Sequence, residues 1–268
     1  MLAITGNAMF LTQYWDRKDV PAEIAVLFAS QASGNPGLHH RVFDREAAAA
    51  HIATHNGPRA AAAFAECAVP AMQADYFRYC ALLVDGGFWC DADARCVRPL
   101  SDLLPDDADG VLFERPNNNV PNGCMAFRAP GHPLMQLVHD IATAGIERRV
   151  SNSVWVTTGP GILTYLMLLS RLGPEDRRRL DYDHIGVDVT RSIRLCAEIA
   201  AASFPDLDRL FDGVAVRPFA LVESHAPDAP VEYKAGPAHW VHWPGSIFSS
   251  GAIADGDGDA RAEDARTP

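Results

Sequence analysis

The segment at residues 74–93 constrains the fold of this chain more than any other part of the sequence. It reads Ala-Asp-Tyr-Phe-Arg-Tyr-Cys-Ala-Leu-Leu-Val-Asp-Gly-Gly-Phe-Trp-Cys-Asp-Ala-Asp. Pro70 suits the first turn of a helix, and apolar residues then recur at helical spacing. Gly86-Gly87 predicts the end of this helix, because glycine adopts the left-handed conformation without a side-chain clash. A short, bulky strand at residues 88–90 is expected to follow.

Two acids, Asp91 and Asp93, come directly after this expected strand. In an extended backbone, residues two apart direct their side chains to the same side. Carboxylate oxygens suit hard divalent cations such as Mn²⁺ or Mg²⁺, which commonly complete their coordination with water and phosphate oxygens. The pair therefore predicts a metal site that holds a diphosphate. The alternative is a simple turn, where Asp is common because its side chain bonds nearby backbone N–H groups.

Asp75 and Arg78 share another side of the expected helix. They either belong to the same site or form an exposed i,i+3 ion pair, which contributes roughly 0.2–0.5 kcal/mol. Asp-x-Asp also occurs at Asp107/Asp109, at residues 181/183 and 206/208, and in residues 255–259. None of these pairs follows a helix, a glycine turn and a strand, so only the pair at residues 91 and 93 is taken as a site.

Strands and helices alternate along the chain. We expect strands at about residues 8–14, 38–43, 88–90, 110–114, 122–128, 214–217 and 219–223, and helices at about 21–31, 45–54, 59–67, 70–85, 133–144 and 161–171. This alternation predicts an α/β fold with a mostly parallel central sheet flanked by helices. In such sheets ligands bind beyond the carboxyl ends of the strands, which is where the two acids fall.

Composition limits the partners of the chain. Its 23 basic and 34 acidic residues give a net charge of −11, which argues against a nucleic-acid partner. Its six cysteines form no Cys-x-x-Cys pair or zinc-type spacing, and they indicate a reducing compartment. The start lacks a signal-peptide pattern, and we expect no transmembrane segment and a cytoplasmic location. We expect one domain at residues 1–251 and a disordered tail at residues 252–268.

The 74–93 segment resembles the signature of the glycosyltransferases with a sugar-binding region containing the DXD motif, a family 32-type group that includes initiating mannosyltransferases and capsular-polysaccharide transferases. The family pattern runs Ser/Ala-Asp-x-x-Arg-Tyr, a Leu, Gly-Gly-x-Tyr-x-Asp-x-Asp and Pro-Leu. This chain supplies each part and closes it with Pro99-Leu100, with Phe88 or Trp89 in place of the usual Tyr. Weaker similarities lie at residues 10–15, 35–37, 122–127, 130–133, 158–161 and 238–243, so the resemblance covers about residues 8–248.

The resemblance implies a GT-A-type nucleotide-sugar-binding fold and a metal-dependent, retaining transfer of a hexose. The donor would be a UDP- or GDP-hexose, the cofactor Mn²⁺ or Mg²⁺, and the acceptor a glycan or another small hydroxyl compound, as in polysaccharide biosynthesis. Asp93 would bind the metal, and Asp91 would share the metal or contact the ribose. Asp75 and Arg78 would hold hydroxyls of the donor sugar, and Asn122 would be a further donor contact.

Three assignments keep two interpretations each. Tyr14 or Trp15 would stack on the nucleotide base or else pack in the core. His242, rather than His239, would be a third metal ligand or else a packed histidine beside Trp240 and Trp243. Thr158-Gly159-Pro160-Gly161 would present a helix N-terminus to an anion or serve only as a structural turn.

Two other classes of protein remain in view. A metal-dependent phosphohydrolase of nucleotide sugars would also use paired acids, although the chain has no Walker-type phosphate loop. A non-catalytic protein that binds sugar nucleotides or glycans would need no intact catalytic set. The presence of Asp75, Arg78, Asp91 and Asp93 together favours the transferase.

Overall fold

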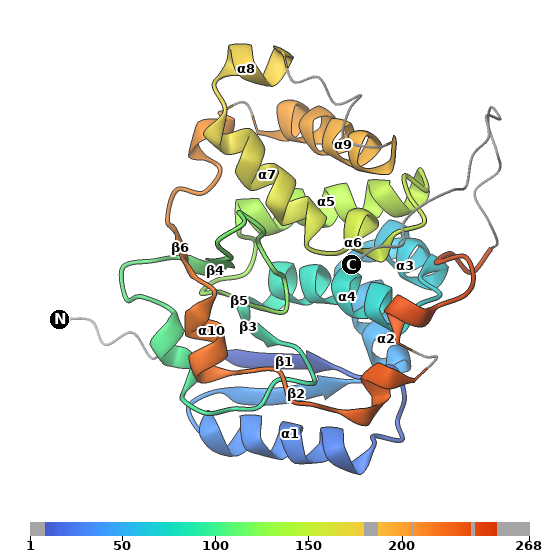
Figure 1. Ribbon diagram of the computed structural model, residues 1–268, viewed down its shortest axis with the longest axis vertical. Coiled ribbons are helices and arrows are strands. Elements are labelled where there is room, and N and C mark those ends of the chain that lie inside the picture. The colour runs from blue at the N-terminus through green and yellow to red at the C-terminus, as the bar shows by residue number, and fades with distance from the viewer. Residues whose placement is uncertain (1–8, 180–186, 205, 237–238, 251–268) are drawn as a thin grey trace.

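The computed structural model describes residues 9–179, 187–204, 206–236 and 239–250, and a six-stranded sheet lies at its centre (Figure 1). The strands are β1 (Phe10–Tyr14), β2 (His39–Phe43), β3 (Gly87–Cys90), β4 (Gly110–Glu114), β5 (Cys124–Phe127) and β6 (Val214–Pro218), in the order β2-β1-β3-β5-β4-β6. β5 runs antiparallel to β3 and β4, and the other three pairings are parallel. The predicted α/β class with a mostly parallel sheet is confirmed.

Helices cover this sheet on both sides. The α-helices are α1 (Ala22–Gly34), α2 (Arg45–His55), α3 (Gly57–Glu66), α4 (Pro70–Asp85), α5 (Pro133–Glu147), α6 (Val154–Thr157), α7 (Gly161–Arg171), α8 (Pro174–Arg179), α9 (Val187–Ser203) and α10 (Ala220–His225). Short 3₁₀ helices are η1 (Leu100–Leu103), η2 (Leu207–Arg209), η3 (Glu232–Ala235) and η4 (Trp240–His242). In Figure 1, α1 lies beyond β2 on one side, and α4, α5, α7 and α9 lie on the other. None of the described helices is both long and apolar enough to cross a bilayer.

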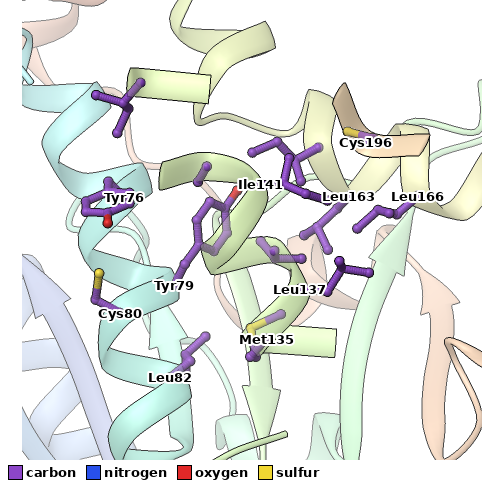
Figure 2. Close-up of a cluster of buried hydrophobic side chains, with 14 of the residues drawn as sticks. Tyr76, Tyr79, Cys80, Leu82, Met135, Leu137, Ile141, Leu163, Leu166 and Cys196 are labelled. Carbon is purple, nitrogen blue, oxygen red and sulfur yellow. The ribbon is translucent and has the colours of Figure 1, made fainter. Parts of the chain in front are cut away.

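α4 is the central helix of this arrangement. It contacts β1 and β3 on one side and α5 on another, and α5 in turn contacts α7 and α9. Figure 2 shows the shared apolar cluster, which contains Tyr76, Tyr79, Cys80 and Leu82 of α4, Met135, Leu137 and Ile141 of α5, Leu163 and Leu166 of α7, and Cys196 of α9. A helix that is buried nearly all round is fixed by packing, so any polar side chain on it is held in place.

A glycine turn sets the angle between α4 and β3. Gly86 and Gly87 have φ values of 62° and 87°, which residues other than glycine rarely adopt. A Cβ added to Gly87 would lie 2.4 Å from the carbonyl oxygen of Phe10, so the chain needs glycine here to bring β3 beside β1. The predicted glycine stop is confirmed.

The structure differs from the predicted elements at several boundaries, and α6, α8 and α9 were not predicted. Residues 219–223, expected as a strand, belong to α10 and the residue that precedes it. The apolar residues Phe219, Val222 and Ala226 contact one core cluster, and their spacing of three and four is helical rather than alternating. β5 begins at Cys124, so Asn122 precedes the strand. The predicted tail at residues 252–268 lies outside the described residues.

Candidate active site

Asp75 and Arg78 form a buried ion pair on α4. Arg78 Nη2 lies 2.8 Å from Asp75 Oδ1, and the two side chains are 4% and 8% exposed. The interpretation of this pair as an exposed surface contact is therefore wrong. Burial raises the pKa of Asp75 to about 7, although Arg78 and Asn122 both favour the ionised form.

Asn122 joins this pair from the loop before β5. Its Nδ2 donates to Asp75 Oδ1 at 3.0 Å and to the Tyr79 hydroxyl at 2.9 Å. The backbone carbonyl oxygen of Asn122 accepts a short hydrogen bond from Arg78 Nη1. Because β5 is antiparallel to β3, the residues just before β5 lie beside the residues just after β3, and Asp91 N–H donates to the Gly123 carbonyl at 2.8 Å.

Asp91 lies at the carboxyl end of β3 and faces the same residues. Its Oδ1 accepts from Trp89 Nε1 at 2.9 Å and lies 3.2 Å from Arg78 Nη1. Burial and the Asp93 carboxylate raise the pKa of Asp91, and Arg78 opposes them. Arg78 thus connects the acid on the helix with the first acid of the motif.

Asp93 occupies a turn rather than extended chain. The Ala94 N–H donates to the Asp91 carbonyl at 3.1 Å, which closes the turn. The expected extended backbone between the two acids is therefore wrong, but both side chains still line the same cavity. The turn and the site are compatible, so the turn alternative does not remove the acids from the site.

Asp93 contacts two residues from the C-terminal part of the chain. Its Oδ2 lies 2.6 Å from Lys234 Nζ and accepts from the Tyr233 hydroxyl at 3.2 Å. Sequence reasoning missed both partners, since no motif marks them. The contact raises the pKa of Lys234, although partial burial of the ammonium acts in the opposite direction.

These side chains surround one cavity of about 710 Å³, a size typical of sites for small molecules and cofactors. Its described lining includes five acids, Asp16, Asp75, Asp91, Asp93 and Asp228, and five bases, Arg17, Arg45, Arg78, Arg115 and Lys234. The acidic excess of the whole chain is therefore absent from the cavity wall, which is compatible with an anionic ligand.

Tyr14 and Trp15 form another part of the wall, at the end of β1. The Tyr14 hydroxyl donates to Gln73 Oε1 at 2.8 Å, so this side chain is fixed within the protein. Trp15 is 7% exposed and lies edge-on to Tyr233, with ring centroids 5.2 Å apart. Both rings are buried and both border the cavity, so core packing and stacking on a ligand stay open as interpretations of these positions.

The structure does not bring His242 to the two acids. His242 is exposed and is not among the residues that line the cavity, whereas His239 does line it. No group of three His, Cys, Asp or Glu side chains suited to a metal occurs among the described residues. Two carboxylates in one cavity still fit a hard divalent cation that takes its other ligands from water and phosphate.

The turn at residues 158–161 packs behind the site. The Tyr79 hydroxyl donates to the Gly159 carbonyl at 3.3 Å, and α7 begins at Gly161. Tyr79 therefore links this turn to Asn122. Tyr79 is the Tyr that ends the Ser/Ala-Asp-x-x-Arg-Tyr pattern and lies one turn after Asp75, but no role in the site was predicted for it from the sequence.

Comparisons with known proteins find similarity to glycosyltransferases over part of the chain. A family model described as a glycosyltransferase sugar-binding region containing DXD motif matches residues 15–109. The chain is 26% identical over 100 residues to "Putative glycosyltransferase HOC1" of Saccharomyces cerevisiae, which covers 37% of this chain and 25% of the yeast protein. A solved structure titled "PaToxG Glycosyltransferase" has a TM-score of 0.47 and 14% identity, covering 76% of this chain and 86% of that chain.

Residues 15–109 contain α4, β3 and both acids of the motif. This region of the chain is similar to glycosyltransferases whose sugar-binding region contains the DXD motif. This family generally binds a divalent metal. The chain spans about a quarter of the length of the curated relative.

Proposed function

We propose that this chain is a metal-dependent, retaining glycosyltransferase that moves a hexose from a UDP- or GDP-sugar to a glycan or another hydroxyl acceptor. The observation that carries the proposal is the convergence of Asp91 and Asp93 with the Asp75–Arg78–Asn122 network on one cavity. The family match supports a sugar nucleotide as the ligand of this cavity, because the matched region is described as a sugar-binding one.

Each part of the wall has a proposed task. Asp91 and Asp93 would hold Mn²⁺ or Mg²⁺, which supplies positive charge to the departing diphosphate. Asp75, Arg78 and Asn122 offer carboxylate, guanidinium and amide groups to the hydroxyls of the donor sugar. Trp15 offers an aromatic surface to the nucleoside end of the donor.

Retention of the anomeric configuration follows most simply if the acceptor replaces the diphosphate on the same face of the sugar. The bond between the anomeric carbon and the diphosphate oxygen breaks, and the acceptor oxygen forms its bond on the same face. The acceptor proton passes to the departing phosphate oxygen, so no carboxylate nucleophile is needed. Asp75 is 8% exposed and bound to Arg78 and Asn122, which makes it a poor nucleophile and a good positioning group.

We also propose that the chain acts in the cytoplasm as a single domain. All six cysteines are free, which supports a reducing compartment. One sheet includes strands from β1 to β6, at residues 10–218, which supports treating this region as one unit.

Donor-dependent thermal stabilisation tests the proposal. A nucleotide sugar at hundredfold excess over its Kd stabilises the folded state by about 2.7 kcal/mol, which raises the Tm by about 5 °C or more. We expect UDP- or GDP-hexoses to do this only with Mn²⁺ present. Asp93→Ala should abolish the Mn²⁺-dependent shift, and the matched control Asp107→Ala, in an exposed Asp-x-Asp pair, should keep it.

The released product separates the three classes of protein. A transferase releases nucleoside diphosphate when an acceptor is present, a phosphohydrolase releases the monophosphate, and a binding protein releases neither. If no UDP- or GDP-hexose stabilises the wild-type chain with Mn²⁺ present, the proposed donor is wrong.

A further inference from the structure

Lys234 is placed unusually for this chain. The sequence contains two lysines, Lys18 and Lys234, and the second lies on the DXD motif. Its Nζ is 2.6 Å from Asp93 Oδ2 and 3.6 Å from Asp228 Oδ2. Its side chain also lines the cavity. The Lys234 ammonium therefore contacts Asp93, the carboxylate that is proposed to bind the divalent metal ion.

The backbone that carries Lys234 is fixed. Residues 226–236, here called the strap, run beside residues 93–97. The Ala229 N–H donates to the Asp93 carbonyl at 2.8 Å, and the Arg95 N–H donates to the Pro227 carbonyl at 2.9 Å. Glu23 of α1 accepts hydrogen bonds from the backbone N–H groups of Glu232 and Tyr233 at 2.8 and 3.2 Å. Any movement of the ammonium must therefore come from the side chain.

The side chain itself has room to move. Lys234 is 31% exposed, whereas the other cation at the motif, Arg78, is 4% exposed. Arg78 contacts two carboxylates and a carbonyl oxygen, so its departure would leave buried charge unpaired. Lysine has a compact charge on a flexible four-carbon stem. Of these two cations, Lys234 is the one that can exchange partners.

We propose that Lys234 neutralises Asp93 in the ligand-free protein and moves to the diphosphate of the donor when a divalent cation binds Asp93. This inference rests on the proposed function and adds a donor-binding residue to it. Like charges within a few ångströms repel strongly in a partly buried site, so the ammonium and the divalent cation exclude each other at one carboxylate. The phosphate oxygens of the donor provide the new acceptors.

The test measures the two halves of the exchange separately on the full chain. Lys234→Met removes the ammonium and keeps an unbranched apolar stem. Electron paramagnetic resonance of free Mn²⁺ gives the affinity for Mn²⁺ alone. Calorimetric titration with UDP and with GDP at saturating Mn²⁺ gives the affinity for nucleotide. Lys18→Met is the matched control, because Lys18 is exposed, pairs only with Glu46 among the described residues, and lies outside the cavity lining.

The proposal predicts opposite changes in Lys234→Met. Mn²⁺ alone should bind several-fold more tightly, since no ammonium competes for Asp93. UDP or GDP should bind about tenfold more weakly or worse, the usual size of one hydrogen bond to a charged group. Lys18→Met should match the wild type in both measurements.

Two results would overturn the exchange. Unchanged nucleotide affinity in Lys234→Met would show that the ammonium does not reach the diphosphate, and weaker Mn²⁺ binding would show that it does not compete with the metal. A wild-type chain that binds neither nucleotide with Mn²⁺ present would instead refute the proposed function, and this inference with it. The two failures are therefore distinguishable.

Discussion

Arg78 is the residue through which the charges of the candidate site are balanced. Its guanidinium contacts Asp75 at 2.8 Å and Asp91 at 3.2 Å, and lies 5.0 Å from the ring centroid of Trp89. A planar guanidinium presents five N–H donors in a rigid fork, a geometry that a lysine ammonium does not reproduce. Removing one partner of a buried ion pair is costly mainly because the other charge remains buried and unpaired.

Arg78→Met should therefore destabilise the protein by about 3–5 kcal/mol at pH 8, the usual cost of leaving a buried charge alone. Urea unfolding measures this directly. The double variant Asp75→Asn/Arg78→Met should recover part of the loss, because it removes the unpaired carboxylate as well. A single Arg78→Met variant as stable as the wild type would contradict the buried pair.

The pH dependence of this cost has a definite sign. Burial raises the pKa of Asp75 to about 7 from its usual 3.8 even with Arg78 present, and loss of Arg78 should raise it further. When a carboxyl has a higher pKa in the folded than in the unfolded protein, the protein loses stability as the pH rises from about 4 through the folded pKa. Arg78→Met should thus cost less at pH 5, where Asp75 is protonated in both folded proteins, than at pH 8, where Arg78 stabilises the ionised carboxylate of the wild type.

Sequence reasoning found some of these residues and missed others for a physical reason. Asp75, Arg78, Asp91 and Asp93 lie within nineteen positions of one another, so local spacing could indicate a shared site. Lys234 meets Asp93 from 141 positions away, and only the path of the strap decides that contact. Neither periodicity nor composition carries that information.

At the scale of elements, the α4–β3 turn determines where the motif lies. The glycine pair was predictable because helix periodicity stops there and a strand-like run begins. The sequence could not reveal the close approach of Gly87 to Phe10, because that contact depends on the pairing of β3 with β1. The prediction of a strand at residues 219–223 was wrong for a related reason. Over so short a segment, the same apolar residues fit both the period of a strand and the period of a helix.

Three glycine-to-alanine variants separate backbone conformation from crowding. Gly87→Ala should cost at least about 3 kcal/mol, since it combines a positive φ with a contact of 2.4 Å to a backbone oxygen. Gly131→Ala should cost about 1–2 kcal/mol, because its φ is 71° but no atom lies within 4 Å of the added Cβ. Gly37→Ala, which has neither constraint, should stay within about 1 kcal/mol of the wild type. Urea midpoints rank the three, and equal costs at Gly87 and Gly131 would contradict the crowding.

At the scale of the whole molecule, the site is assembled from both ends of the described chain. β1 supplies Tyr14, α4 and the residues that follow β3 supply the charged side chains, and the strap supplies Tyr233 and Lys234. The family match ends at residue 109, so the strap lies outside the matched region and its part in the site comes from the fold alone. Glu23 of α1 bonds two backbone N–H groups of the strap more than 200 positions away, and Ala229 and Val231 of the strap share an apolar cluster with Ile24, Leu27 and Phe28 of α1.

Glu23→Ala should loosen the strap without touching the cavity, since Glu23 is not among its lining residues. Each hydrogen bond to a charged acceptor contributes about 1.5–3 kcal/mol, so the amides of Glu232 and Tyr233 should exchange with deuterium at least about tenfold faster. Mass spectrometry of a peptide that covers residues 230–236 measures this exchange. Glu198→Ala is the matched control, because its 60% exposed side chain pairs with Arg148 at the surface. If exchange in the strap is the same in both variants, Glu23 does not hold it, and the strap owes its position to the Ala229 hydrogen bond and to the apolar contacts of Ala229 and Val231.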